Sequence, residues 1–457
     1  MDEWLQLLNS TPPITTFPVK MDHVNEPILI HEGEFKLKLD DKMITITGKI
    51  HYEWFPILGS KFSGKAANVS FFTIMPFFNE SEKVELIIDG VIFGKAKLIE
   101  VSDFPTGAEM EGIIPYGVKG DKAIVVTKVR FAIPNLRNFN GNVTKERIET
   151  NDHIKRTRIT FENDDYLIII DRRHKYEEFR RELKNKGGYF LLYSGELTKK
   201  KGNIGLEKLN DLLRCFSNFL WFLNGRRCSP LFLQGVYEEE VIWTEYRRNY
   251  VDQYKYVITW PQEHDINGLN ELWQEFYRIW NNEDDKDFLV SAVHWYIEAN
   301  SNSGFVEGAI IMAQTALELI YNLLLIEKKK ILNGKDAESI SASNKIRLLL
   351  SHLNVSYEIP NSFNELNLIA KELTPKPVDA PDLFVRIRNA IVHSQETKRK
   401  ELANMPDEVK LEALQLGIWY IELSLLYILK FEGKYSNRSS ISFSSPVPDE
   451  VPVPWKK

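Results

Sequence analysis

Residues 407–432 read DEVKLEALQLGIWYIELSLLYILKFE, and this stretch decides the fold class of the C-terminal part of the chain. Its apolar residues recur every three or four positions, which is the spacing that places them on one face of an α-helix. Gly433 follows at once and is typical of the end of a helix. Because Glu422 and Lys430 interrupt the apolar run, the pattern predicts a buried helix rather than a membrane span.

The same helical periodicity extends upstream of this stretch to about residue 266. The helices that it predicts there span 268–280, 285–300, 304–330, 342–354 and 381–396. We therefore expect residues 266–435 to form one all-α domain. The remaining residues, 436–457, are rich in Ser, Pro and Val and show no periodicity, which predicts an extended or disordered tail.

The first 205 residues follow a different pattern, with short runs in which apolar and polar residues alternate. Glu34–Leu39 and Met43–Thr47 have the two-residue period of half-buried strands, and Asp40-Asp41-Lys42 between them fits a hairpin turn. Asp89-Gly90 is a second hairpin signal, because glycine adopts a positive φ at little cost. Many short strands with Gly, Pro and Asn between them predict a β-rich, sandwich-like domain over residues 1–205.

A segment of mixed character joins these two regions. Leu206–Leu223 carries a helical apolar stripe that Gly225 ends, and strand-like pieces follow at Gly235–Thr244 and Tyr254–Thr259. We interpret residues 206–265 as a linking segment. The predicted fold class is therefore α+β multidomain, with a β-rich sandwich-like N-terminal domain followed by an all-α helical bundle.

Composition narrows the classes of function. The formal net charge is -6, which argues against a protein that coats nucleic acid through bulk electrostatics. There are only two cysteines, Cys215 and Cys228, so no disulfide framework is expected. The N-terminus has no basic segment followed by an apolar one, so we expect no signal peptide and a cytoplasmic protein.

Most motifs that carry chemistry are missing from the sequence. It has no phosphate-binding GxxxxGK[ST] loop, no GxGxxG, no HExxH, no GxSxG and no paired CxxC. The nine histidines are scattered, without a second ligand at a spacing that suits zinc. We therefore expect no metal and no cofactor.

The segment Arg388–His393, RNAIVH, is the strongest candidate site that remains. On a helix, a five-residue offset places two side chains about 140° apart, so Arg388 and His393 can line one pocket mouth. Asn389 adds a short polar group beside them. The spacing alone is weak, because Arg347–His352 repeats it and Arg147–His153 is one residue longer. The Leu-rich interior of Arg347–His352 instead suggests a helix used for packing.

These residue types suit acid–base chemistry at a phosphate, of which the cleavage of RNA is one case. RNA carries its own nucleophile, the 2′-hydroxyl, so a metal is not obligatory. A histidine such as His393, with a pKa near neutrality, can take or give the proton. The Arg388 guanidinium stays charged and offers forked donors to a phosphate, and Asn389 can orient the phosphate or the histidine.

RNAIVH, on the penultimate long helix of an all-α C-terminal region, resembles the RNxxxH form of the HEPN superfamily motif. Residues 316–320, ALELI, resemble part of the second helix of that fold, with 292–299 on its hairpin partner. A β-rich N-terminal domain before such a domain resembles the ApeA-type anti-phage proteins of bacteria.

This resemblance implies a metal-independent endoribonuclease of the abortive-infection type, with Arg388, His393 and Asn389 as catalytic residues. It implies a homodimer through the helices, with a composite site that leaves a 2′,3′-cyclic phosphate on the RNA. The N-terminal domain would then sense or restrain, with a phage-derived trigger. The alternative is a non-catalytic binding or sensor protein whose helical domain only dimerises.

Other polar residues favour structural roles. The basic runs Arg172–Lys175, Arg180-Arg181 and Arg226-Arg227 could hold phosphate, but a solvated charged face is the more common reason for such runs. Glu318 lies within an apolar helix, where we expect it to pair with a buried arginine. His294, next to Trp295, is more typical of a helix histidine with its hydrogen bonds satisfied.

Overall fold

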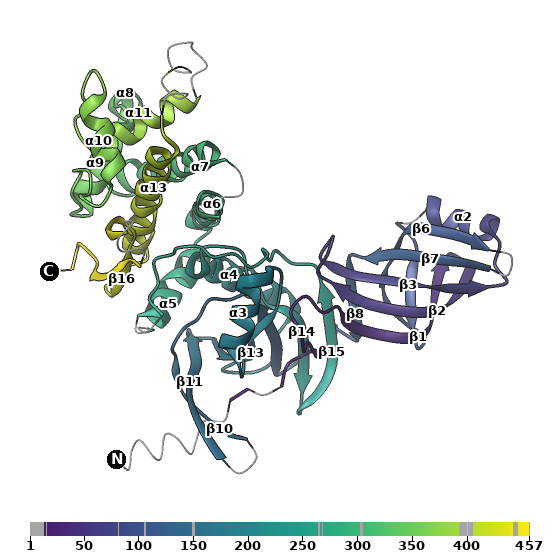
Figure 1. Ribbon diagram of the computed structural model, residues 1–457. Coiled ribbons are helices and arrows are strands. Elements are labelled where there is room, and N and C mark those ends of the chain that lie inside the picture. The colour runs from purple at the N-terminus through teal and green to yellow at the C-terminus, as the bar shows by residue number, and fades with distance from the viewer. Residues whose placement is uncertain are drawn as a thin grey trace. The chain divides into compact units, whose positions relative to one another are not determined.

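The computed structural model describes the chain in two compact units, which we call the sheet unit and the helical unit (Figure 1). The sheet unit comprises Met1–Arg137, Gly141–Ser217 and Cys228–Tyr256, and the helical unit comprises Asn138–Asn140, Asn218–Arg227 and Val257–Lys457. The structure describes all residues except 1–12, 15, 81, 105–106, 149–150, 264–265, 267, 302–304, 393–399, 401–404, 442–446 and 457. The predicted α+β organisation is confirmed at this level.

The sheet unit is built on one 15-stranded sheet in which every pair of neighbouring strands is antiparallel. Its strands are β1 (Ile28–Leu39), β2 (Lys42–Glu53), β3 (Gly59–Ala67), β4 (Glu85–Ile88), β5 (Val91–Lys95), β6 (Lys97–Phe104), β7 (Gly107–Ile114), β8 (Tyr116–Gly120), β9 (Lys128–Pro134), β10 (Asn142–Ile148), β11 (Asn151–Glu162), β12 (Tyr166–Arg172), β13 (Leu191–Lys199), β14 (Leu231–Tyr237) and β15 (Glu240–Arg247). Their order is β10-β11-β12-β13-β9-β14-β15-β8-β5-β4-β1-β2-β3-β7-β6. Hydrogen bonds therefore connect these strands into one continuous sheet. The sequence had instead predicted a sandwich-like domain.

Both predicted hairpins are present. β1 and β2 pair up to Leu39 and Lys42, and Asp40 in the turn has a φ of 49°. β4 and β5 pair up to Ile88 and Val91 across Asp89-Gly90, whose φ angles are 51° and 83°. Two successive positive φ angles are typical of the type I′ turn, which matches the twist of the two strands in a two-residue hairpin.

Among its described residues, the sheet unit includes all or part of three helices: α2 (Phe71–Asn79), α3 (Tyr176–Lys186) and α4 (Leu206–Asn224). The predicted apolar stripe forms α4, and Gly225, with a φ of 67°, ends it. Phe216 on this helix contacts Phe161 and Phe131 of the sheet, with ring centroids 5.6 and 6.3 Å apart. The boundary between the two units falls within α4.

The helical unit confirms the predicted helical region. Its helices are α5 (Leu269–Trp280), α6 (Glu283–Asn300), α7 (Val306–Tyr321), the π-helix η1 (Asn322–Lys328), α8 (Gly334–Ser339), α9 (Ala342–His352), α10 (Asn364–Glu372), α11 (Ala380–Val392) and α13 (Asp407–Ile428). The short helices α8 and α10 were not predicted, because neither is long enough to display a clear apolar period.

The central helix of this unit is α13, which packs against α6, α7, α10 and α11. Every residue from Leu416 to Leu426 is buried, whereas the periodicity predicted a single buried face, and Leu411 near the start of the helix is 42% exposed. Close packing depends on Gly417, where an added Cβ would lie 2.8 Å from the Phe384 ring and 3.3 Å from Ala313. Val306–Lys328 and Asp407–Ile428 are long and apolar enough to cross a membrane by length and composition alone, and most of each is buried.

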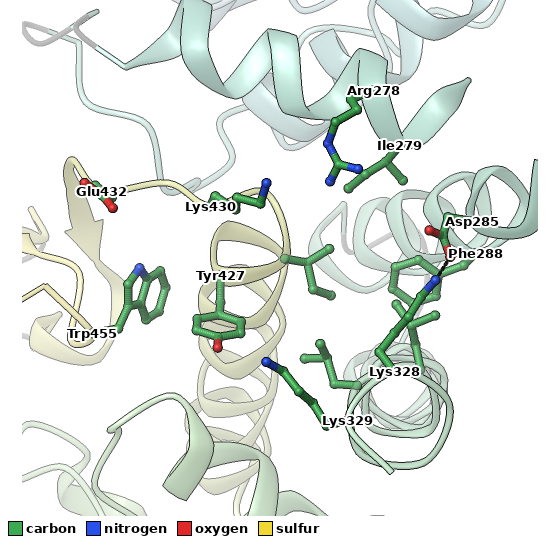
Figure 2. A pocket seen from close by; sticks show the side chains of 13 residues that line it. Arg278, Ile279, Asp285, Phe288, Lys328, Lys329, Tyr427, Lys430, Glu432 and Trp455 are labelled. Carbon is green, nitrogen blue, oxygen red and sulfur yellow. Dashed lines mark ion pairs between the residues drawn. The ribbon is translucent and has the colours of Figure 1, made fainter. Parts of the chain in front are cut away.

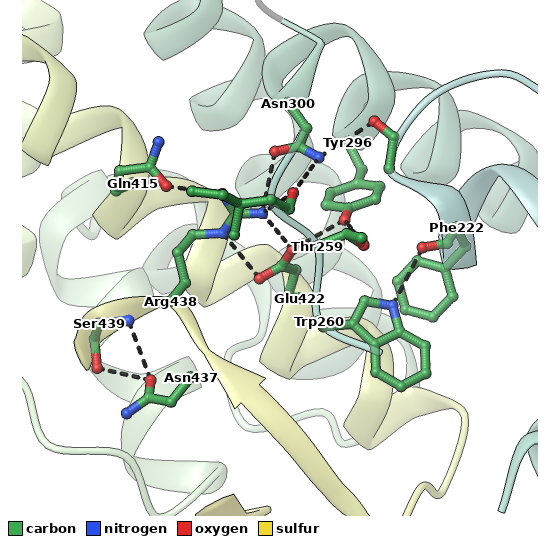
Figure 3. A network of polar contacts seen from close by, with 12 residues as sticks. Phe222, Thr259, Trp260, Tyr296, Asn300, Gln415, Glu422, Asn437, Arg438 and Ser439 are labelled. Carbon is green, nitrogen blue, oxygen red and sulfur yellow. Dashed lines mark hydrogen bonds and ion pairs between the residues drawn. The ribbon is translucent and has the colours of Figure 1, made fainter. Parts of the chain in front are cut away.

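Residues 436–457, predicted as an extended or disordered tail, are built into the helical unit where they are described. β16 (Lys434–Asn437) pairs with β17 (Asp449–Pro452), and the short 3-10 helix η2 (Arg438–Ser440) lies between them. Arg438 is 1% exposed and pairs with the fully buried Glu422 of α13 at 2.6 Å (Figure 3). The tail was predicted to be disordered because it is rich in Ser, Pro and Val and has no periodicity. A single buried ion pair leaves no periodic signal, so the sequence pattern could not reveal it.

Candidate functional site

The helix that carries the candidate site, α11, is fixed at its start by Asp379. The Asp379 carboxylate accepts a hydrogen bond from the backbone N–H of Asp382 at 3.0 Å, as a helix N-cap does. The same carboxylate accepts a hydrogen bond from Nη2 of Arg347 on α9 at 2.8 Å. The buried side chains of α11 are Ala380, Pro381, Leu383, Phe384, Ile387 and Ala390. The helix is therefore held both at its start and along one face.

Arg388 and Asn389 lie side by side on α11, and both are half-buried. The Arg388 Nη1 donates a hydrogen bond to Oδ1 of Asn389 at 3.1 Å. The Arg388 Nε is buried and has no hydrogen-bond partner among the described residues. One predicted pair of site residues is thus in contact, whereas His393 lies outside the described residues.

Tyr321 is a further polar group near Arg388, and it comes from the end of α7. Burial raises the pKa of the Tyr321 hydroxyl, the charge of Glu318 raises it further, and the charge of Arg388 opposes the rise. The hydroxyl therefore stays protonated at neutral pH. The Lys345 ammonium of α9 lies 5.3 Å from the centroid of the Tyr321 ring. Tyr321 therefore interacts with Arg388 of α11 through charge and with Lys345 of α9 through its ring.

The sequence did not single out Tyr321 or Lys345. Tyr321 falls on the apolar stripe of its helix, where an aromatic residue is normally part of the core, and Lys345 looks like an ordinary surface lysine. Only the packing of α7, α9 and α11 against one another brings Lys345 to the Tyr321 ring and Tyr321 within the electrostatic influence of Arg388. Glu318, which was expected to pair with a buried arginine, is exposed on α7.

The competing pair Arg347–His352 has structural partners. Arg347 pairs with Asp379 at the start of α11. The His352 Nε2 lies 3.0 Å from the Tyr427 hydroxyl, and the two rings meet edge to face with centroids 5.3 Å apart. Desolvation lowers the pKa of His352, and the charge of Lys329 lowers it further. These contacts agree with the predicted packing role of this helix.

The basic runs are likewise engaged in packing. The Arg173 guanidinium lies 4.9 Å from the centroid of the Phe190 ring, and burial lowers its pKa. Arg227 pairs with Glu298 and lies over the ring of Trp221. His294 is exposed beside Trp295, with ring centroids 5.0 Å apart. Within the part of the chain that the structure describes, His, Cys, Asp and Glu side chains form no group of three that could hold a metal ion.

Comparison with known proteins connects this chain to YopA-type proteins. Residues 121–257 match the model of the YopA central domain, and residues 282–447 match the model of the YopA C-terminal domain. The chain is also similar to the SPbeta prophage-derived uncharacterized protein YopA of Bacillus subtilis (strain 168). The two are 28% identical over 444 residues, which cover 95% of this chain and 96% of the relative. No solved structure matches the chain.

The C-terminal match lies wholly within the helical unit. It begins at the start of α6 and includes all of α7, α9, α11 and α13. The four residues gathered above, Tyr321, Lys345, Arg388 and Asn389, therefore all fall in the region shared with the YopA C-terminal domain.

Proposed function

We propose that the helical unit is an HEPN-type ribonuclease domain that cleaves RNA without a metal, using Arg388, Asn389 and His393. The supporting observation is the placement of Arg388. Its half-buried guanidinium has an Nε without a partner among the described residues, and its charge opposes the rise in the pKa of the buried Tyr321 hydroxyl. A phosphate bound at Arg388 would meet a charged guanidinium, which is a strong donor to anionic oxygens.

In this proposal the RNA 2′-hydroxyl attacks the adjacent phosphorus, and the bond from phosphorus to the 5′-oxygen breaks. His393 accepts the 2′-hydroxyl proton or protonates the leaving 5′-oxygen. Arg388 stabilises the charge that accumulates on the phosphate oxygens, because its fork of N–H donors matches two of them. The hydrogen bond from Arg388 to Asn389 holds the guanidinium in place. The products are a 2′,3′-cyclic phosphate and a 5′-hydroxyl.

The proposed site is half of a composite site, and a second copy of the chain would complete it through the helical domain. We assign the sheet unit the role of sensing or restraint, with a phage-derived trigger. The similar protein of Bacillus subtilis is prophage-derived by name. A prophage-borne ribonuclease that stops growth when another phage enters would protect the surrounding lysogens.

The experiment is incubation of the purified full-length protein with total RNA in EDTA. The wild type is compared with Arg388→Ala, Arg388→Lys and His393→Ala, and loss of general acid–base catalysis should slow cleavage by about 10²–10⁴-fold in His393→Ala. Arg388→Lys should also lose most activity, since lysine keeps the charge but not the fork.

Arg386→Ala is the matched control, because Arg386 lies on the same helix and its Nη1 donates instead to the Pro375 carbonyl at 2.6 Å. It should cleave like the wild type. Cleavage that persists in both the Arg388 and the His393 variants would refute the site. Absence of cleavage under every activating condition would favour the alternative of a non-catalytic binding protein whose helical domain only dimerises.

A further inference from the structure

The helical unit contains a pocket of about 430 Å³ that is separate from the residues of the candidate RNA site (Figure 2). Such a volume lies in the range of roughly 300–1,000 Å³ that is usual for small-molecule sites. The lining comes from α5, α6, η1, α13 and the C-terminal segment: Arg278, Ile279, Asp285, Phe288, Leu323, Leu324, Lys328, Lys329, Tyr427, Ile428, Lys430, Glu432 and Trp455. None of Tyr321, Lys345, Arg388 and Asn389 lines it.

Positive charge exceeds negative charge in this lining. The cations are Arg278, Lys328, Lys329 and Lys430, against the two acids Asp285 and Glu432. Arg278 and Lys430 both pair with Glu275, and Lys328 pairs with Asp285 at 2.6 Å. Lys329 has no carboxylate partner among the described residues. Its ammonium is therefore the lining charge that is available to an anionic ligand.

The backbone presents Lys328 and Lys329 at the pocket through the π-helix η1. The N–H of Lys329 donates to the carbonyl of Leu324 at 3.0 Å, five residues back, which is the hydrogen-bond spacing of a π-helix. Leu323 and Leu324 of the same segment contribute apolar lining. π-helical turns are rare and are frequently found at functional sites.

Two aromatic side chains form another part of the pocket. The rings of Tyr427 and Trp455 meet at 86° with centroids 5.3 Å apart. A hydrogen bond fixes each side chain. Trp455 Nε1 donates to the Phe431 carbonyl at 2.9 Å, and the Tyr427 hydroxyl lies 3.0 Å from Nε2 of His352. Figure 2 shows Trp455 and Tyr427 next to each other, with the Lys329 ammonium directed toward the side of Tyr427.

We propose that this pocket binds a nucleoside phosphate of mononucleotide size. The base lies against the fixed rings of Trp455 and Tyr427, since stacking on an aromatic face is favourable for every base. The phosphate is held by Lys329, and the excess of cations in the lining favours its charge. This binding does not depend on the proposed cleavage of RNA, because no catalytic residue takes part.

The test is direct binding of AMP to the full-length protein by isothermal titration calorimetry. Adenosine, ribose 5-phosphate and inorganic phosphate serve as partial ligands, and each should bind at least about tenfold more weakly than AMP, because each loses one of the two contacts. Lys329→Gln and Trp455→Ala should each weaken AMP binding by about tenfold or more. Lys330→Gln is the matched control, because Lys330 is the neighbouring lysine and does not line the pocket. It should bind AMP like the wild type.

Lys329 is exposed, so its variant should fold like the wild type, and circular dichroism checks this. Failure of AMP, GMP, CMP and UMP alike to bind at millimolar concentration would overturn the proposal. Equal binding by wild type and Lys329→Gln would also overturn it, because the ligand would then lie elsewhere. If a hexanucleotide RNA binds more tightly than AMP, and Lys329→Gln removes this difference, the ligand of the pocket is a segment of nucleic acid. That result would overturn the proposal of a mononucleotide.

Discussion

Replacement of Arg438 by methionine should destabilise the helical unit more than any surface substitution. Arg438 donates two hydrogen bonds to the Glu422 carboxylate, at 3.1 Å from Nε and at 2.6 Å from Nη2. It also donates to Oε1 of Gln415 and to Oδ1 of Asn300, at 2.7 and 3.1 Å, and to the carbonyl of Ile258 at 2.7 Å. Methionine fills similar space but can satisfy none of these acceptors.

The magnitude follows from what the substitution leaves behind. Glu422 is 0% exposed, and in the variant only the Tyr296 hydroxyl, at 2.9 Å, would still donate to it among the bonds described for it (Figure 3). Removal of one partner from a buried ion pair costs about 3–5 kcal/mol, mostly because the other charge remains buried without compensation. We expect about 4 kcal/mol for Arg438→Met on this basis.

The assay is native-state hydrogen exchange of the α13 amides, which reports the opening free energy of the helical unit without requiring the whole chain to unfold in one step. The double variant Arg438→Met/Glu422→Gln is the control. It removes the uncompensated charge and leaves an acceptor for Tyr296, so it should recover part of the loss. A loss below about 1 kcal/mol in Arg438→Met, or a double variant less stable than the single one, would refute the reasoning.

Three smaller predictions concern packing and turns. His352→Ala should lower the melting temperature but leave RNA turnover nearly unchanged. Because the folded-state pKa of His352 lies below its ordinary value, the stability of the wild type should fall as the pH drops through about 6.5 and below. The variant should lose this pH dependence of stability. Gly417→Ala should cost about 1–3 kcal/mol by urea denaturation, since its Cβ would lie 2.8 Å from Phe384, and an unchanged midpoint would contradict the packing described. Gly90→Val should cost about 1 kcal/mol although no atom lies within 4 Å of the added Cβ, because a φ of 83° strains a β-branched residue, whereas Gly90→Asn should cost less.

The parts of the fold that the sequence predicted are those whose signal is local. The helices α5, α6, α9 and α13 begin and end within a few residues of their predicted bounds, because each displays several turns of apolar period. The two hairpins were predicted because Asp40 and Asp89-Gly90 can adopt the positive φ angles of a hairpin turn without help from distant residues.

What the sequence did not reveal depends on contacts between distant residues. The tail is ordered where described because Arg438 meets Glu422 of α13, and a single pair of this kind has no spacing to detect. The same holds for the candidate site. Arg388 and Asn389 were found because they adjoin in the chain, whereas Tyr321 and Lys345 come from other helices. α13 was expected to bury one face, but its neighbours bury every residue from Leu416 to Leu426.

The measurement that tests the central proposal most directly is the chemistry of the RNA ends. Full-length protein is incubated in EDTA with an intact RNA that it is known to cut. A second sample contains the same RNA with a single 2′-deoxy nucleotide at the position of the cut. If Arg388 and His393 promote attack by the 2′-hydroxyl, the products carry 2′,3′-cyclic phosphate and 5′-hydroxyl ends, and the 2′-deoxy RNA is not cut at that position. Products with 5′-phosphate ends, or cleavage of the 2′-deoxy RNA at the same bond, would contradict the mechanism.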